Sequence, residues 1–265
     1  MAHTLIVIRG GGDLGSGVTH RLYVAGYDVA ILEIEQPLVI RRAVAFATAV
    51  FDGSVTVEGV GATCVTDVAQ ARAMLAGRVI PVLVDGQGIT LAALQPAALV
   101  DARLAKRNLD TRMSDAPVVI ALGPGFVAGR DAHAVIETQR GHDLGRVIWQ
   151  GEAAPDSGVP GAVGGEAINR LLRAPSAGAF RSVRQIGDRV AAGETIGYVA
   201  DSPVISAIGG VLRGIIHDGV SVPARLKIGD VDPRGMVEHC FTISDKARAI
   251  GGGVLEALLH LRVLP

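Results

Sequence analysis

Cysteine is scarce in this chain of 265 residues, which contains only Cys64 and Cys240. The two lie in unrelated contexts, without a CxxC pair or a repeated spacing. The sequence therefore predicts neither a disulfide framework nor a zinc site, and we expect no bound metal. A reducing, cytoplasmic setting is the simplest one for such a chain.

Long apolar runs are also missing. No stretch reaches the roughly 18 residues that a membrane-spanning helix needs, and no basic segment precedes an apolar core near the first residues. Acidic and basic residues nearly cancel, 26 against 25, so no net field attracts nucleic acid or an anionic membrane. We expect a cytoplasmic protein that is not exported and whose partners are small molecules or proteins.

The first third of the chain has the order of a nucleotide-binding βαβ unit. An apolar run at residues 5–8 predicts a buried parallel strand. It leads into a GxGxxG loop at Gly10, Gly12 and Gly15 and a helix. A second strand ends in Glu33, 18 residues past Gly15, close to the roughly 20 expected of the carboxylate that binds a ribose hydroxyl. The pattern predicts a Rossmann-like α/β domain with a parallel sheet; the alternative is a glycine turn that only lets helix and strand pack closely.

One acid interrupts this motif, because Asp13 lies within the glycine loop. A carboxylate about 4 Å from a phosphate costs on the order of 4 kcal/mol at an effective dielectric of about 20, more than a good hydrogen bond returns. Asp13 therefore either turns away and caps the helix that begins near Leu14, or faces a ligand accompanied by a cation. Residue preferences at helix starts favour the cap.

A candidate ligand contact also follows a later strand. A capped helix is predicted from Thr66 or Asp67 to Gly77, and a buried strand then closes on Asp85. Residues just past the carboxyl ends of parallel strands line the ligand crevice of open α/β sheets. Asp85 is thus a candidate cofactor-binding residue, although it could simply cap the next turn.

A second glycine loop follows the apolar strand before Leu122 and contains Gly123 and Gly125. The backbone amides of such a loop can approach a ligand closely. Lys106 and Arg140 flank the loop in sequence, and a guanidinium is well suited to bind carboxylate or phosphate. We include these four residues among the predicted cofactor contacts.

Histidines in the same region raise the question of a metal. His133, Glu137 and His142 could form a ligand set, but their spacing matches no known motif. A histidine in a loop is more often a hydrogen-bonding residue. We therefore predict no metal ligands here.

The last third contains a short internal repeat. At a constant offset of 32, Val190, Ile196, Gly197 and Val199 match Val222, Ile228, Gly229 and Val231. The repeat predicts two similar half-sheets with pseudo-twofold symmetry and resembles the biotinyl/lipoyl-type barrel-sandwich domain. Carrier members of that family have a modified lysine in the hairpin between the halves. Here that stretch, residues 199–210, has no lysine, so we expect no biotin or lipoate attachment, and a structural or docking module.

Three segments are expected along the chain. Residues 1–175 form the Rossmann-like domain with its second glycine loop, and residues 176–232 form the barrel-sandwich domain. Residues 233–265 end in a helix with Ser244 as its N-cap. This helix packs back on the core or on a second subunit, so a homo-oligomer is one of the options.

Four blocks of the sequence together resemble the YqeB-type family, the accessory proteins of selenium-dependent molybdenum hydroxylases. They are VIRGGGDLGSGVTHRLYVAGYDVAILEIEQPLVIRRAVAF, DTRMSDAPVVIALGPGFVAGRDAHAVIETQRGHDLGRVI, SAIGGVLRGIIHDGVSV and KIGDVDPRG. The resemblance covers nearly the whole chain. It implies a role in assembling or inserting the modified molybdenum cofactor of xanthine-dehydrogenase-like client enzymes. It carries over no catalytic residue.

The leading hypothesis is a cytoplasmic maturation protein that binds a nucleotide or the pterin dinucleotide form of the molybdenum cofactor. In it the three glycines of the first loop allow close backbone approach, Glu33 contacts a sugar hydroxyl, and Arg140 or Lys106 contacts an anionic group.

Two alternatives stay open. An NAD(P)-dependent oxidoreductase needs a proton donor in the crevice, and His133 or His142 could serve only within reach of the nicotinamide. A non-catalytic scaffold would dock the hydroxylase, with a purely structural glycine loop. Sulfur or selenium transfer by the protein itself is disfavoured, because the apolar context of Cys64 keeps its thiol protonated.

Overall fold

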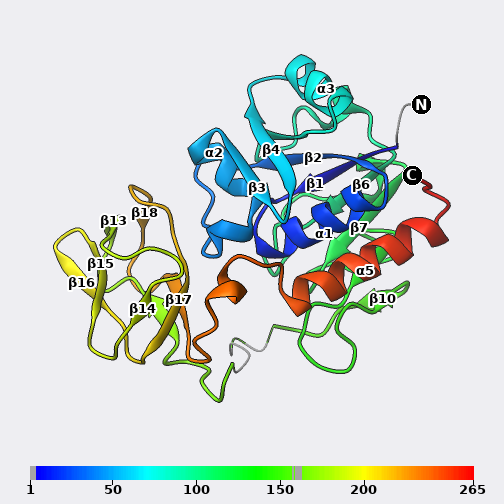
Figure 1. Ribbon diagram of the computed structural model, residues 1–265. Coiled ribbons are helices and arrows are strands. Elements are labelled where there is room, and N and C mark those ends of the chain that lie inside the picture. The colour runs from blue at the N-terminus through cyan, green and yellow to red at the C-terminus, as the bar shows by residue number, and fades with distance from the viewer. Residues whose placement is uncertain (1–3, 157, 159–162) are drawn as a thin grey trace. The chain divides into compact units, whose positions relative to one another are not determined.

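The computed structural model describes residues 4–156, 158 and 163–265. The chain divides into two compact units (Figure 1). Unit 1 comprises Met1–Pro37, Ala45–Asp156 and Ile243–Pro265, and unit 2 comprises Leu38–Val44 and Ser157–Thr242. The last helix therefore belongs to the same unit as the first strand.

Unit 1 is built on a nine-stranded sheet with the order β10-β9-β7-β6-β1-β2-β5-β4-β3. The inner strands run parallel, and the edge strands β3 and β10 are antiparallel to their neighbours. The bounds are β1 Leu5–Arg9, β2 Asp28–Glu33, β3 Ser54–Val57, β4 Val60–Val65, β5 Ile80–Val84, β6 Ala98–Asp101, β7 Val118–Leu122, β9 Ala134–Ile136 and β10 Val147–Ile148. A small separate pair joins β8 Val127–Ala128 to β11 Gly151–Glu152. The predicted α/β class with a mainly parallel sheet is confirmed.

The order of the strands reverses beside β1. The chain passes from β1 through a helix to β2 on one side, and returns after β5 to β6 on the other side of β1. The segments that follow β1 and β6 therefore leave the same edge of the sheet in opposite directions. In open α/β sheets such a switch point at the carboxyl ends of the strands is where ligands bind.

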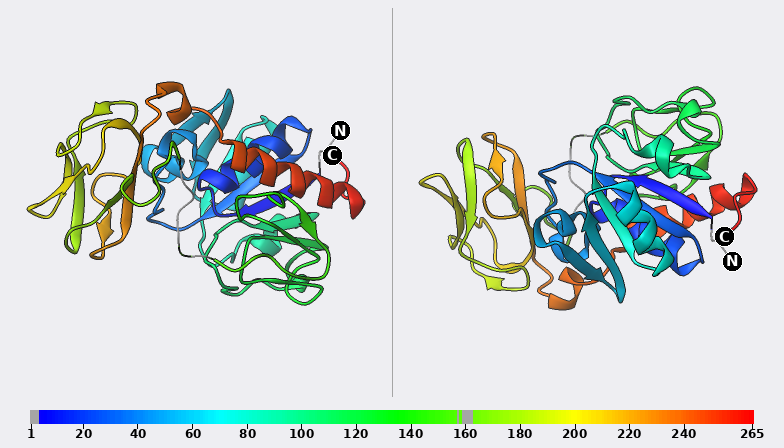
Figure 2. Two further views of the ribbon diagram at one scale, coloured as in Figure 1. Left: turned by 90° about the horizontal axis from the view of Figure 1, so that it is seen from below. Right: turned by 90° about the horizontal axis from the view of Figure 1, so that it is seen from above.

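Two long helices of unit 1, α1 (Asp13–Val24) and α5 (Asp245–His260), lie side by side on one face of this sheet (Figures 1 and 2). They run in the same direction, since Gly17 faces Ala247 and Arg21 faces Gly251. Their N-termini thus lie at the same end. The opposite face is covered by α3 (Val68–Ala76) and α4 (Leu91–Leu94), which share a core cluster with apolar side chains of β1, β5 and β6.

Local sequence signals explain the helix ends. Asp67 accepts a hydrogen bond from the Gln70 amide at the start of α3 (2.9 Å), and Ser244 accepts one from the Ala247 amide at the start of α5 (3.2 Å). Both predicted N-caps are confirmed. The remaining short helices are η1 Arg42–Val44, η2 Phe46–Thr48, α2 Ala49–Asp52, η3 Met113–Asp115 and η4 Val237–Cys240.

Unit 2 contains two four-stranded sheets, with orders β12-β19-β17-β14 and β16-β15-β13-β18. The strands are β12 Leu171–Arg173, β13 Gly178–Ser182, β14 Arg189–Val190, β15 Thr195–Val199, β16 Ser202–Ile205, β17 Gly210–Ile215, β18 Ser221–Val222 and β19 Lys227–Asp232. The two copies of the sequence repeat are the pairs β14–β15 and β18–β19. Exchanging β12 with β16, β13 with β17, β14 with β18 and β15 with β19 converts one strand order into the other. The repeat thus appears as two topologically equivalent sheets.

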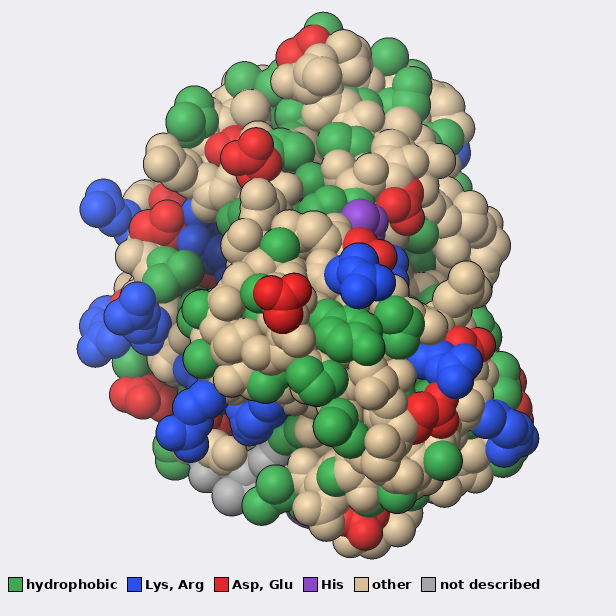
Figure 3. Space-filling model, turned by 90° about the vertical axis from the view of Figure 1, so that its left-hand side faces the viewer, with side chains coloured by type: hydrophobic (Ala, Val, Ile, Leu, Met, Phe, Trp, Pro, Cys, Tyr) green, Lys and Arg blue, Asp and Glu red, His purple; other side chains and the backbone are tan. Residues whose placement is uncertain are grey.

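The surface carries no marked excess of one charge on the face shown in Figure 3, where acidic and basic side chains are intermixed. Within the described part of the chain, no helix combines the length and the apolar character needed to cross a bilayer.

Candidate functional site

The first glycine loop connects β1 to α1 at the switch point. Gly10 has a φ of +100°, and a Cβ added to it would lie 2.9 Å from the carbonyl oxygen of Ala102, just after β6. A Cβ on Gly11 would lie 2.9 Å from the Ala47 amide nitrogen, and one on Gly15 would overlap the carbonyl of Gly10. Packing within the protein accounts for these three glycines.

Gly12 is different. It is the N-cap residue of α1, with a φ of −68° and a ψ of −176°, a conformation that any residue can adopt. Among the described residues, no atom outside Gly12 and its two chain neighbours lies within 4 Å of a Cβ built on Gly12. Neither its conformation nor its packing therefore requires glycine. The missing side chain leaves the first turn of α1 open to a group from outside the protein.

The prediction that Asp13 caps this helix is wrong. The helix begins at Asp13 itself, and Gly12 holds the N-cap position without a side-chain bond. The extended conformation of Gly12 already starts the helix, so Asp13 falls in the first helical turn. A carboxylate in that turn is stabilised by the helix dipole rather than by capping.

Glu33, the predicted sugar contact, lies directly against the glycine loop. Its Oε2 accepts a hydrogen bond from the Gly11 amide and its Oε1 accepts one from the Ile34 amide, both at 2.8 Å. The residue is 8% exposed. Burial raises the pKa of Glu33, and the two backbone hydrogen bonds offset only part of that effect. The carboxylate thus fixes the loop, while each oxygen retains a lone pair for a further donor.

The second glycine loop is filled by the protein's own chain. Gly123 has a φ of +75°, and a Cβ on it would lie 2.5 Å from Oγ1 of Thr138. A Cβ on Gly125, whose φ is +100°, would overlap the backbone of Arg107. The Asn108 amide also donates to the Gly125 carbonyl (3.0 Å). The glycines allow two backbone segments to meet here.

Asp85 follows β5 and bonds to its own turn. Its carboxylate accepts hydrogen bonds from the Ile89 amide (3.0 Å), the Thr90 amide (2.7 Å) and the Thr90 hydroxyl (2.7 Å). Burial raises the pKa of Asp85, but these bonds outweigh it and the net shift is downward. Asp85 therefore caps the turn that follows β5, which is the alternative to a contact with a cofactor.

The two predicted cationic contacts are held in ion pairs. Lys106 Nζ lies 2.6 Å from Oδ2 of Asp156. Arg140 forms a bidentate pair with Asp245, at 2.7 and 2.8 Å. The second pair links the end of β9 to the first turn of α5.

Lys246, in the first turn of α5, has electrostatic neighbours from several elements. Burial lowers its pKa and the like charge of Arg140 lowers it further, whereas the carboxylates of Asp13, Glu137 and Asp156 raise it. The N-terminal turns of α1 and α5 and the segment after β9 thus share one charged neighbourhood. Lys246 is not among the site residues predicted from the sequence. A cation in the first turn of a helix opposes the helix dipole, and that signal could have identified it.

His133 and Glu137 lie at opposite ends of β9. Nδ1 of His133 accepts a hydrogen bond from the Val119 amide (3.0 Å) at the amino end of the strand. The Glu137 carboxylate accepts bonds from the Gln139 and Ala154 amides, both at 2.7 Å, at the carboxyl end. Across the described residues, no three His, Cys, Asp or Glu side chains gather as a metal site would require.

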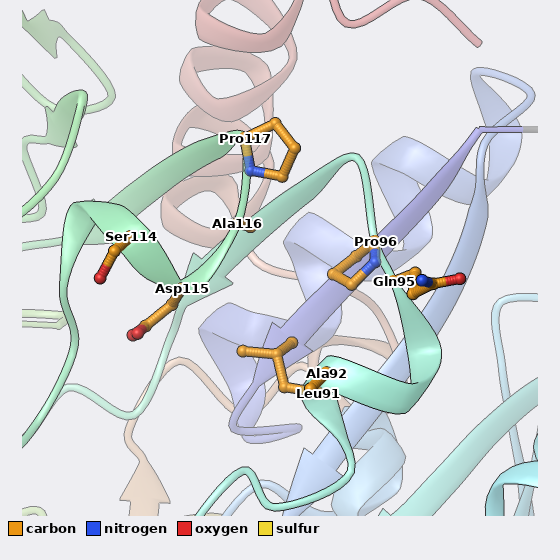
Figure 4. A pocket seen from close by; sticks show the side chains of 8 residues that line it. All are labelled: Leu91, Ala92, Gln95, Pro96, Ser114, Asp115, Ala116 and Pro117. Carbon is orange, nitrogen blue, oxygen red and sulfur yellow. The ribbon is translucent and has the colours of Figure 1, made fainter.

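A cavity of about 510 Å³ lies elsewhere in unit 1, beside the amino ends of β6 and β7 (Figure 4). It is lined by Leu91, Ala92, Gln95, Pro96, Ser114, Asp115, Ala116 and Pro117. The carboxylate of Asp115 accepts a hydrogen bond from the Arg112 amide (2.9 Å). Most of the other lining side chains are apolar. The cavity lies at the amino ends of the strands, whereas the glycine loops lie at their carboxyl ends.

Comparison with known proteins gives one relative that spans this chain. Over 259 residues the chain is 52% identical to the uncharacterised protein YqeB of Escherichia coli K12, covering 98% of this chain and 48% of that protein. The chain is thus a homologue of YqeB and spans about half its length. No family model matches.

Solved structures give only a distant likeness. An aspartoacylase family protein from Mesorhizobium loti is 11% identical, with coverage of 87% and 85% and a TM-score of 0.26. A succinylglutamate desuccinylase/aspartoacylase from Rhodobacter sphaeroides is 13% identical, with the same coverage and TM-score.

Proposed function

We propose that this homologue of YqeB is an accessory protein for the maturation of molybdenum hydroxylases, selenium-dependent ones included. Unit 1 would be a Rossmann-like domain that binds a nucleotide or the pterin dinucleotide form of the molybdenum cofactor. The maturation role rests on the family resemblance of the sequence. The ligand site rests on the geometry of the first glycine loop.

Gly12 is the observation that carries the ligand site. Gly10, Gly11 and Gly15 are explained by close packing, but Gly12 borders open space at the N-terminus of α1. Serine or aspartate would be a better N-cap than glycine by a few tenths of a kcal/mol. A position where glycine costs stability and meets no neighbour is best explained by a ligand that approaches the backbone.

The charges around this loop fit a ligand with a phosphate. The free amides of a helix N-terminus and its dipole favour an anion. Asp13 opposes it, and Lys246, which also neighbours Glu137 and Asp156, offsets that carboxylate in part. Glu33 lies beside the loop, where a sugar hydroxyl could donate to its remaining lone pairs. Lys106 would contact a second anionic group after leaving Asp156.

Unit 2 would serve as the docking module for the client hydroxylase. Its two equivalent sheets fit a barrel-sandwich domain. The hairpin between the halves contains no lysine, and the nearest one, Lys227, begins β19. A swinging-arm role would need that lysine in the hairpin, so docking is the function that this unit supports.

The oxidoreductase alternative finds no support in the position of His133. Its first candidate proton donor, His133, lies at the amino end of β9 and bonds through Nδ1 to Val119. The glycine loop lies at the carboxyl edge of the same sheet. A nicotinamide bound at the loop would therefore be remote from this imidazole.

A ligand panel tests the proposal. Pterin dinucleotide, NAD, NADP and ATP are offered separately to the full chain, and the thermal midpoint is measured. A ligand at 100 times its dissociation constant adds about 2.7 kcal/mol to the stability. We expect the pterin dinucleotide to raise the midpoint. If none of the four does, the nucleotide site is refuted and the docking scaffold is the better account.

A further inference from the structure

Two arginines flank the switch point of the sheet and converge on one carboxylate. Arg9 is the last residue of β1, and its Nη1 and Nη2 lie 2.8 and 3.0 Å from the two carboxylate oxygens of Asp110. Arg103 follows β6 by two residues, and its Nη2 lies 2.7 Å from Oδ1 of Asp110. Both guanidinium groups thus meet at one point, between the two strands where the strand order reverses.

The three side chains differ in exposure. Arg9 is 4% exposed and Arg103 is 15% exposed, whereas Asp110 is 47% exposed. Burial raises the pKa of Asp110, but the hydrogen bonds from Arg9 and Arg103 outweigh it and lower the pKa. An ionised carboxylate therefore covers two buried cations from the solvent side.

Arg103 has a second partner that stays in place. Asp101, the last residue of β6, is 1% exposed and lies 2.6 Å from Nη2 of Arg103. It also accepts a hydrogen bond from the Thr111 hydroxyl (2.6 Å). The Arg9 guanidinium also donates a hydrogen bond to the carbonyl oxygen of Gly86 (3.2 Å). If Asp110 moved away, the charges of Arg9, Arg103 and Asp101 would sum to one net positive charge, centred on Arg9.

The backbone around Asp110 is anchored independently of its side chain. The Asn108 amide donates to Gly125, and the Thr111 amide donates to the Asn108 side chain at 2.9 Å. The half-exposed carboxylate can therefore rotate into solvent while the loop keeps its place.

We propose that Arg9 and Arg103 form a binding site for a phosphate dianion, and that Asp110 occupies this site when no ligand is present. A phosphate offers guanidinium groups the same paired oxygens as a carboxylate, with more negative charge. The location, between the carboxyl ends of the two strands at the switch point, is the ligand crevice of open α/β sheets.

This site is distinct from the one at Gly12. Side chains alternate along a strand, so Arg9 points to the same face as Val7, which packs with α3 and α4. The helix α1 covers the other face. Phosphate binding by the two arginines is therefore independent of the proposed nucleotide site.

The test measures binding of inorganic phosphate by calorimetry at constant ionic strength. Asp110→Asn removes the competing charge but keeps the shape, so the affinity for phosphate should rise about tenfold or more. Arg9→Met in the Asp110→Asn background should abolish the gain. Asp143→Asn is the matched control, since it removes another exposed carboxylate of an ion pair, the one with Arg146 (2.8 Å), and it should leave the affinity unchanged.

A second background separates the two sites. Gly12→Ser blocks the N-terminus of α1, and the gain caused by Asp110→Asn should persist in the double variant. If the gain disappears there, phosphate was binding at α1 and the arginine site is refuted. Equal affinity of Asp110→Asn and wild type would also refute it. Should Asp110→Asn not fold, Arg103→Met in the otherwise wild-type chain must lose the phosphate binding that wild type shows, and unchanged binding overturns the proposal.

Discussion

Two glycine-to-alanine substitutions in neighbouring helices should change stability in opposite directions. Gly17 lies in α1 where it meets α5, and a Cβ there would lie 2.6 Å from Cβ of Ala247 and 2.9 Å from its carbonyl oxygen. Gly252 lies in α5, and among the described residues no atom lies within 4 Å of its added Cβ apart from the adjoining backbone of its own helix. Neither has a positive φ.

The magnitudes follow from these distances. Alanine is favoured over glycine inside a helix by about 1 kcal/mol, so Gly252→Ala should stabilise the protein by that amount. Gly17→Ala gains the same propensity but forces the helices apart, because 2.6 Å is well below the 3.4 Å of an ordinary contact. Overpacking of this kind costs roughly 1–3 kcal/mol. We therefore expect Gly17→Ala to lower the free energy of unfolding by about 1 kcal/mol.

Thermal and urea unfolding of the full chain measure the difference. The free energies of unfolding of the two variants should differ by about 2 kcal/mol. The thermal midpoint should shift by roughly 2–4 °C for each kcal/mol. Wild type should lie between them. If both variants are stabilised, the close parallel packing of α1 and α5 is incorrect, and with it the adjacency of their N-termini.

Two further predictions concern titration. Because burial raises the pKa of Glu33 above 4.5, the folded state binds this proton more tightly than the unfolded chain does, so Glu33 destabilises the protein increasingly as the pH rises through that range. NMR titration of Glu33 should give a pKa above 4.5, and a value below it would contradict its burial against the glycine loop. Because burial and Arg140 lower the pKa of Lys246 below 10.5, amine labelling of Lys246 followed by mass spectrometry should have its pH midpoint below 10.5. Arg140→Gln should move that midpoint upward, and an unchanged midpoint would place Arg140 outside the neighbourhood of Lys246.

Features with a local signal could be predicted from the sequence. The apolar run of β1, the caps at Asp67 and Ser244, and the 32-residue repeat each appear in the structure as strands, helix starts and equivalent sheets. These signals depend on residues that are close in the chain. They suffice for the α/β class and for the position of the first glycine loop.

Features that depend on distant pairing could not be predicted. Arg9 and Asp110 are 101 residues apart in sequence, and their meeting depends on the return of the chain from β5 to β6. Lys246 joins Asp13 only because α5 runs parallel to α1. The role of Asp13 was misjudged for a different reason, since Gly12 and Asp13 are both acceptable helix starts and only the backbone decides between them.

In the proposed function, the first glycine loop is open for a ligand at Gly12. Calorimetry on two variants tests this opening, with the ligand that the panel identifies. Gly12→Ser improves the N-cap but fills the opening. Gly61→Ser in β4 is the matched control, since among the described residues a Cβ on Gly61 also meets no atom within 4 Å beyond its two chain neighbours. We predict that Gly12→Ser folds at least as stably as wild type and loses ligand binding, while Gly61→Ser binds normally. Unchanged binding by Gly12→Ser would contradict the proposed site.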